Sequence, residues 1–217
     1  MIAACVGDYR ELARRRLPRY LFDYIDGGSF AEQTLANNVA DLGRVTLRQR
    51  VLRDVSKVDL STTALGQPIA MPVALGPVGM AGMNARRGEV QAARAAERAG
   101  IPFTLSTVST CSLSEVRSQV GKPLWFQLYM IRDRGILAEL INAAERAQCS
   151  ALLFTVDLPL PSSRYREVRS SLRHAGGVRP VLHQMLQNAS RPGWLYDVAL
   201  RAIWRSEERR VGKECRS

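Results

Sequence analysis

The chain has 217 residues, of which 46% are hydrophobic and 24% are charged, and its net charge is +11. These proportions suit one soluble globular unit, near the lower size limit of a complete eightfold barrel. No apolar run approaches the roughly 18 residues of a membrane-spanning helix, and residues 2–6 are too short for a signal-peptide core. We therefore expect a cytoplasmic protein.

The cysteines and the charge exclude several classes of site. Cysteines are scattered, with neither CxxC spacing nor a dense framework, so we expect reduced thiols and no metal site. The positive charge favours an anionic surface as a partner. A nucleic-acid-binding module has only this charge in its favour, because no binding motif is present, and we expect no nucleic acid.

The last thirteen residues, 205–217, differ from the rest of the chain. Eight of them are charged, and the apolar periodicity of the preceding segment stops there. The string resembles translated sequencing-adapter read-through, so we expect a non-native tail; the alternative is a solvated basic tail. Removing its five basic and three acidic residues lowers the net charge from +11 to +9.

The N-terminal part of the chain has helical patterns followed by weak strand signals. The second helix opens with Pro18 and ends at Gly27-Gly28, where a left-handed C-cap costs glycine little. Residues 45–69 have mixed short β signals, with a turn at 66–68. Three short helices are expected, at 9–16, 18–26 and 31–42.

A strand and helix alternation follows. Apolar strand-like runs centre near Val73, Phe103, Trp125 and Leu152, at intervals of 30, 22 and 27 residues. Such alternation predicts βαβ units and a parallel sheet. Stretches rich in Ala, Glu and Arg between these runs predict helices at 88–99, 113–119 and 135–147.

Polar residues at the ends of these runs favour a barrel over a Rossmann sheet. Residues 76–79 close the first run, 106–107 the second, and polar side chains also close the third and fourth. Barrel chemistry uses the C-terminal ends of several strands, whereas residues 76–82 lack the GxGxxG spacing of a Rossmann turn. The predicted fold is α/β, the N-terminal half of a TIM (β/α)8 barrel. About four of its eight strands are present, preceded by short N-terminal helices.

Six segments between Tyr9 and Trp204 form a recognisable series. They are Phe22-Asp-Tyr24-Ile-Asp-Gly-Gly28, Met71-Pro-Val-Ala-Leu-Gly-Pro-Val-Gly79, Phe103-Thr-Leu-Ser106-Thr107, Trp125-Phe-Gln127-Leu-Tyr129, Phe154-Thr155-Val-Asp157 and Arg164-Tyr165-Arg166. In their order and spacing they resemble the FMN-dependent L-2-hydroxy-acid dehydrogenase family, most of all its bacterial L-lactate dehydrogenase branch. The resemblance implies oxidation of L-lactate or a similar 2-hydroxy acid with FMN as cofactor.

The resemblance implies a set of flavin contacts. A flavin needs a flat slot with neutral donors at its polar edge, and Gly and Pro permit close backbone approach. Taken singly, these residues also fit an ordinary βα turn or a helix-approach position. Ser106, Gln127 and Thr155 would contact the flavin, and the backbone of Pro77, Val78 and Gly79 would lie against its reactive edge.

Tyr24, Tyr129 and Arg164 would hold the substrate, by the same resemblance. The planar guanidinium of Arg164 matches a carboxylate in two-point geometry. The alternatives are a solvated loop for the arginine and core packing with a wet hydroxyl for the tyrosines. The residues before Arg164, and Glu167 after it, depart from the commoner glycine and aspartate of the family.

The residues that would complete such a site are not found in this sequence. The family takes its base from a Ser-Asn-His-Gly-Gly-Arg segment, whereas this chain has only His174 and His183, in other contexts. The flavin-side lysine and the late phosphate-binding loops are also missing. We therefore expect no catalytic base in this chain, a truncated gene product, and no activity of the fragment alone.

The segment 168–204 predicts a long basic loop. It has five arginines, three large aromatic residues and one acid, Asp197. Basic charge beside aromatics suits an anionic bilayer surface, and the alternative is a mobile loop over the active site. We expect peripheral attachment to the inner face of the cell membrane.

A membrane location favours a quinone or cytochrome acceptor for the electrons. An oxidase of the same barrel family that uses oxygen is the alternative, and glycolate and mandelate are alternative substrates. A homo-oligomer is consistent with the full-length family. We divide the chain into 1–70 (lead-in), 71–167 (first four βα units), 168–204 (basic loop) and 205–217 (tail).

Overall fold

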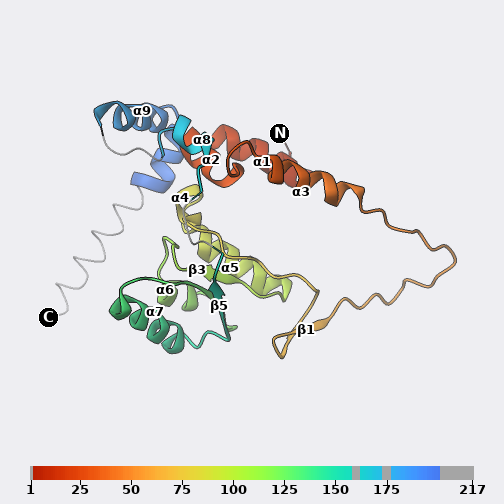
Figure 1. The fold of residues 1–217 in the computed structure, drawn as a ribbon. Coiled ribbons are helices and arrows are strands. Elements are labelled where there is room, and N and C mark those ends of the chain that lie inside the picture. The colour runs from red at the N-terminus through yellow and green to blue at the C-terminus, as the bar shows by residue number, and fades with distance from the viewer. Residues whose placement is uncertain (1, 158–161, 173–176, 201–217) are drawn as a thin grey trace. The chain divides into compact units, whose positions relative to one another are not determined.

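The structure is a computed structural model that describes residues 2–157, 162–172 and 177–200 (Figure 1). The chain divides into two compact units, and each is described by itself. One unit comprises residues 1–50 and 160–217, and the other comprises residues 51–159. These limits do not coincide with the predicted boundaries after residues 70 and 167, and the tail at 205–217 lies outside the described residues.

The first unit is helical in its described residues. The three N-terminal helices are confirmed, with ends shifted by at most three residues from the prediction. Its elements are α1 (Val6–Arg16), α2 (Arg19–Asp26), α3 (Gln33–Arg44), α8 (Tyr165–Arg169), α9 (Val178–Ala189), α10 (Pro192–Trp194) and the π-helix η1 (Leu195–Leu200).

The end of α2 differs from the prediction. Gly27 is the C-cap, but its backbone is extended (φ −88°, ψ 157°), so the predicted left-handed cap is wrong. A Cβ at Gly27 would lie 2.5 Å from the carbonyl oxygen of Asp23, which accepts a hydrogen bond from the Gly27 amide. Glycine is needed here because two backbone segments approach closely.

Helix α9 lies in the segment that was predicted to be a loop. The segment is therefore largely helical in its described part; Arg173, Arg201 and Trp204 lie outside that part. The helix attaches to its unit through polar side chains: Gln187 accepts a hydrogen bond from the Tyr20 amide (3.0 Å) and donates one to the Ser170 carbonyl (3.1 Å).

The second unit opens with a hairpin of β1 (Thr62–Ala64) and β2 (Gln67–Ile69). The predicted turn at 66–68 is displaced, because the turn residues are Leu65 and Gly66, both with positive φ (50° and 74°). Two consecutive residues of this kind form the turn that matches the twist of a two-residue hairpin.

A parallel sheet with helical connections follows in the same unit. The strand order is β3-β4-β5, and a parallel bridge from Leu75 to Phe103 lies where the first strand was expected. The predicted strands and helices are thus confirmed, except that the first strand is reduced to one bridge. The elements are α4 (Ala81–Asn84), α5 (Gly88–Ala99), β3 (Thr104–Ser106), α6 (Leu113–Arg117), β4 (Trp125–Tyr129), α7 (Arg134–Arg146) and β5 (Ala151–Thr155).

The two faces of this sheet differ in chemistry. Leu105, Phe126 and Leu128 pack with residues of α5, α6 and α7 to form the core cluster. Because side chains alternate along a strand, Gln127 and Tyr129 belong to the opposite face. On β5, Leu152 and Phe154 are 48% and 46% exposed, so this strand is covered less than β4.

Candidate active site

Ser106, Gln127 and Thr155 meet on three neighbouring parallel strands, where Ser106 ends β3, Thr155 ends β5 and Gln127 lies two residues before the end of β4. Ser106 is directly opposite Gln127 in the register of β3 and β4. The Gln127 side-chain oxygen accepts from the Ser106 hydroxyl (3.1 Å), and its nitrogen donates to the Thr155 hydroxyl (2.7 Å). Ser106 and Gln127 are each 3% exposed. The structure therefore joins the three residues predicted to contact the flavin ring into one polar cluster.

Thr107 is a fourth member of this cluster. Its amide donates to the Gln127 side-chain oxygen (3.3 Å), and its hydroxyl donates to the Gln127 carbonyl and accepts from the Tyr129 amide (3.3 Å). The sequence pattern marks Thr107 only as the end of a predicted strand. Its position next to Ser106 was the available signal, but its partners 20 to 22 residues away follow only from strand pairing.

The 76–79 loop reaches the same edge of the sheet. Pro77 and Val78 are exposed and Gly79 is half-buried. The loop follows the Leu75 bridge, and the amide of Met80, directly after it, donates to the Val108 carbonyl (2.9 Å). The predicted backbone wall thus lies beside the loop that follows β3.

The chemistry of the cluster fits the polar edge of a flavin. All of its side chains are neutral, and each hydroxyl or amide can donate or accept. Among the described residues, one amide hydrogen of Gln127 and the hydroxyl hydrogen of Thr155 have no protein acceptor. A ring with carbonyl and N–H groups along one edge would use such donors, which suits FMN.

In the other unit, Tyr24 and Arg164, two of the residues predicted to hold the substrate, lie together. The guanidinium carbon of Arg164 is 5.5 Å from the centroid of the Tyr24 ring, within the range of a cation–π contact. Arg164 also donates to the carbonyls of Tyr24 (2.9 Å) and Gly27. Its other terminal nitrogen pairs with the 2%-exposed carboxylate of Glu167. Arg164 is therefore not part of a solvated loop.

Arg166 has a structural role that the sequence did not distinguish from that of Arg164. It forms a two-point ion pair with Glu32 (2.7 and 2.9 Å) and a further pair with Asp26 (2.7 Å). The hydrogen bond from Arg166 lowers the pKa of Glu32. The pKa of Asp26 is also lowered, mostly by the hydrogen bond from Arg10 and to a smaller extent by that from Arg166. Arg164 thus binds Glu167 and two backbone carbonyls, whereas Arg166 binds Glu32 and Asp26.

The remaining predicted residues are located as follows. Tyr129 ends β4, in the second unit, and is half-buried. His183 is on α9, where its Nδ1 lies 2.8 Å from the Ser171 hydroxyl, and His174 lies outside the described residues. The predicted absence of a catalytic base stays a prediction.

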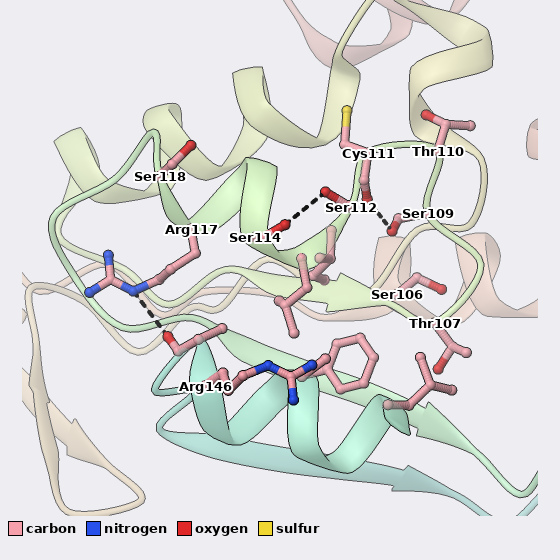
Figure 2. Close-up of a pocket in the computed structure, with 16 residues that line it drawn as sticks. Ser106, Thr107, Ser109, Thr110, Cys111, Ser112, Ser114, Arg117, Ser118 and Arg146 are labelled. Atoms are coloured by element: carbon pink, nitrogen blue, oxygen red, sulfur yellow. Dashed lines mark hydrogen bonds between the residues drawn. The ribbon is translucent and has the colours of Figure 1, made fainter. Parts of the chain in front are cut away.

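A cavity of about 910 Å³ adjoins the polar cluster on the side of α6 and α7. Ser106 and Thr107 line one end, and Figure 2 shows Arg117 away from them, donating to the Ala147 carbonyl (3.1 Å). A second bond from Arg117, to the Val120 carbonyl (2.7 Å), fixes this side chain. The sequence did not indicate this cavity, because it depends on how two helices pack.

Within the described residues, no group of three His, Cys, Asp or Glu side chains is arranged to hold a metal ion. No helix of the described chain is both long and apolar enough to cross a membrane.

Comparisons with known proteins identify the family of this chain. Residues 13–216 match the family model described as FMN-dependent dehydrogenase. The L-lactate dehydrogenase of Xanthobacter autotrophicus is 56% identical over 200 residues, which are 92% of this chain and 51% of that protein. The L-lactate dehydrogenase of Haemophilus influenzae is 50% identical over 201 residues, covering 93% and 52%. The chain belongs to the FMN-dependent dehydrogenase family.

A solved structure supports the same assignment. The chain superimposes on the monotopic membrane protein (S)-mandelate dehydrogenase with a TM-score of 0.83 and 32% identity, covering 93% of this chain and 53% of that one. The predicted fold class is confirmed: the parallel α/β arrangement matches the N-terminal portion of the barrel dehydrogenases, and the described strands form an open sheet. The chain spans about half the length of the curated relatives it matches.

Proposed function

We propose that the whole protein oxidises L-lactate to the 2-oxo acid and passes the electrons to a quinone or cytochrome acceptor. The observation that carries this proposal is the Ser106, Gln127 and Thr155 cluster at the strand ends, in a chain of the FMN-dependent family. Lactate is favoured over mandelate because the named L-lactate dehydrogenases are 50% to 56% identical, whereas the mandelate dehydrogenase is 32% identical.

FMN, when bound, supplies the two-electron redox chemistry. The spare donors of Gln127 and Thr155 would hold the polar edge of its ring, and Ser106 orients the Gln127 amide for this. The backbone of residues 77–79 would cover the reactive edge and exclude water. No residue of this chain is proposed to take the substrate's hydroxyl proton.

Arg164, Tyr24 and Tyr129 would bind the substrate carboxylate and hydroxyl. In the present arrangement Arg164 has a carboxylate partner already, that of Glu167. A substrate carboxylate would take the place of Glu167 on the guanidinium, while the bonds to the Tyr24 and Gly27 carbonyls hold its plane. In this exchange the guanidinium of Arg164 stays paired with an anion, while the buried carboxylate of Glu167 must move to another partner or to water.

Helix α9 supports attachment to a membrane surface. Because its polar side chains bind the rest of the unit, its apolar side chains face outward. This inverts the usual orientation of an amphipathic helix in a soluble protein and suits insertion into the headgroup region of a bilayer. The exposed apolar residues are Val178, Val181, Leu182, Met185 and Leu186.

The proposal is tested with a chimera. Residues 13–204 replace the matching half of the Xanthobacter autotrophicus L-lactate dehydrogenase, and the purified protein is assayed with L-lactate, glycolate and (S)-mandelate. We expect lactate to be the best substrate, and a quinone analogue to reoxidise the flavin much faster than oxygen does. Rapid reoxidation by oxygen alone would favour the oxidase, and loss of flavin from the chimera would contradict the proposal.

A further inference from the structure

Glu89 is a buried carboxylate at the start of α5 that contacts two loops. Its side chain is 2% exposed. One of its oxygens accepts from the Thr110 amide (2.9 Å), and both lie within 3.1 Å of the Thr110 hydroxyl. The carboxylate also packs against the Gly82 backbone, since a Cβ there would lie 2.8 Å from one of its oxygens. Glu89 therefore joins the segment before α5 to the loop that follows β3.

Two glycines near this carboxylate have no room for a Cβ atom. A Cβ at Gly82 would lie 1.9 Å from the Thr110 hydroxyl oxygen and 2.8 Å from a Glu89 carboxylate oxygen. A Cβ at Gly88 would lie 2.6 Å from the Ala81 carbonyl oxygen. Such separations are shorter than any tolerated contact, so both glycines are required by the close approach.

The carboxylate is held in its charged form. Burial raises the pKa of Glu89, but hydrogen bonds from the amides of Thr110, Glu89 and Gly82 more than offset this, and the pKa lies below its usual value. Cys111 beside it is 5% exposed, and burial followed by the charge of Glu89 raises the pKa of this thiol to about 12. Arg87, two residues before Glu89, is paired with Glu115 (3.0 Å).

Both segments that Glu89 holds lead to the proposed flavin site. Gly82 is three residues after Gly79, and the intervening Met80 amide is bonded to the Val108 carbonyl (2.9 Å). On the other side, the Val108 amide donates to the Ser106 hydroxyl (3.3 Å). A shift of either segment would therefore move a wall of the site.

We infer that Glu89 is a positioning residue of the flavin site, which sets the separation between the 77–79 backbone and Ser106 by binding Thr110 and packing against the backbone of Gly82. This inference rests on the proposed function. Glu89 would act on the site through the two segments that it holds, by way of the amide and hydroxyl of Thr110.

The same helix offers a matched control. Glu97, near the C-terminal end of α5, accepts from the amides of Gly121 (2.7 Å) and Lys122 (2.9 Å), just before β4 begins. It is the same kind of carboxylate-to-amide clamp. It lies at the opposite end of the helix, where strands start, and so away from the proposed site.

The experiment compares Glu89→Gln and Glu97→Gln in the chimera. The glutamine keeps the size but removes the negative charge that strengthens the bonds from the amides, and its NH₂ cannot replace the second carboxylate oxygen as an acceptor. We measure the FMN dissociation constant by fluorescence, the flavin absorption maximum, and hydrogen exchange of the clamped amides. We expect Glu89→Gln to weaken FMN binding by about tenfold and to shift the absorption maximum, because a site displaced slightly loses pre-organised contacts. Glu97→Gln should speed exchange only at residues 121–122 and leave FMN binding within about twofold.

Each outcome decides the inference. Equal loss of FMN in both variants, or rapid exchange at Gly82 and Thr110 with unchanged flavin binding and spectrum, overturns it. Should Glu89→Gln fail to fold, Thr110→Val removes only the hydroxyl donor and is expected to weaken FMN binding by about threefold. Should the unmodified chimera hold no flavin, the proposed function fails. Equal exchange at Gly82 and Thr110 in the flavin-free chimera and in its Glu89→Gln variant then overturns the clamp as well.

Discussion

Arg164 binds Glu167, three residues further along the chain, and both side chains are largely buried, with 20% and 2% of their surfaces exposed. The guanidinium also holds the last turn of α2 through two carbonyls. A substrate clamp in this position would already have its charge balanced and its plane fixed before substrate arrives. Arg166, two residues later, makes only structural ion pairs.

This difference between two arginines gives the first prediction. In the chimera, Arg164→Lys keeps the charge but loses the two-point geometry, so kcat/KM for lactate should fall about 30-fold, or about 2 kcal/mol, with flavin content unchanged. Arg166→Lys should lower the melting temperature and leave KM within about twofold. Steady-state kinetics and flavin absorbance check both variants. Near-normal turnover of Arg164→Lys would remove it from the substrate clamp.

The polar cluster gives the second prediction. Gln127→Leu removes both the acceptor for Ser106 and the spare amide donor, so FMN affinity in the chimera should fall by at least about tenfold. Thr63→Val, a similar loss of polarity in the β1 and β2 hairpin, serves as the control. Isothermal titration with FMN is the measurement. Unchanged affinity in Gln127→Leu would show that the ring does not rest on this cluster.

Helix α9 gives the third prediction. Leu182 and Met185 are 55% and 62% exposed, and burying two such side chains in a bilayer contributes about 3 kcal/mol or more. The double change to serine should abolish most sedimentation of the chimera with phosphatidylglycerol vesicles. Val39→Ser with Leu42→Ser, two exposed positions on α3, should leave sedimentation unchanged. An equal effect of the two pairs would contradict attachment through α9.

The 217-residue chain by itself gives the fourth prediction. Leu152 and Phe154 on β5 are nearly half exposed, and an uncovered apolar strand invites association. The isolated chain should therefore elute as aggregates and retain no FMN. Gel filtration after mixing with excess FMN, with a flavin spectrum of the protein peak, tests this. A monomeric yellow peak that oxidises lactate would also contradict the predicted absence of the base.

The charge of Glu89 gives the fifth prediction, a pH dependence. Its pKa is lower in the folded chain than in the unfolded chain, so it contributes stability above the unfolded value of about 4.5, which is lost as the pH falls through the folded value. The difference in melting temperature between the chimera and its Glu89→Gln variant should therefore shrink as the pH drops from 7 to 3. A constant difference would mean that the carboxylate's ionisation is not involved.

The sequence by itself determined the local structure and the identity of the site residues to a large extent. Helix α5 begins and ends where its periodicity predicts, and polar residues at the strand ends marked Ser106, Gln127 and Thr155. Such features depend on neighbours within a few residues, through side-chain period, capping and turn chemistry. Where a local feature was misjudged, as at Gly27, the deciding contact was also local: the carbonyl of Asp23.

The tertiary structure alone decided which polar groups meet. Gln127 finds partners 21 and 28 residues away, and Arg164 binds carbonyls 137 and 140 residues away. The carboxylate of Glu89 lies against Thr110, and α9 turns its polar side inward, although neither pattern is distinctive in the sequence. Hydrogen bonds and ion pairs of this kind have no period along the chain, because their partners are chosen by strand register and helix packing.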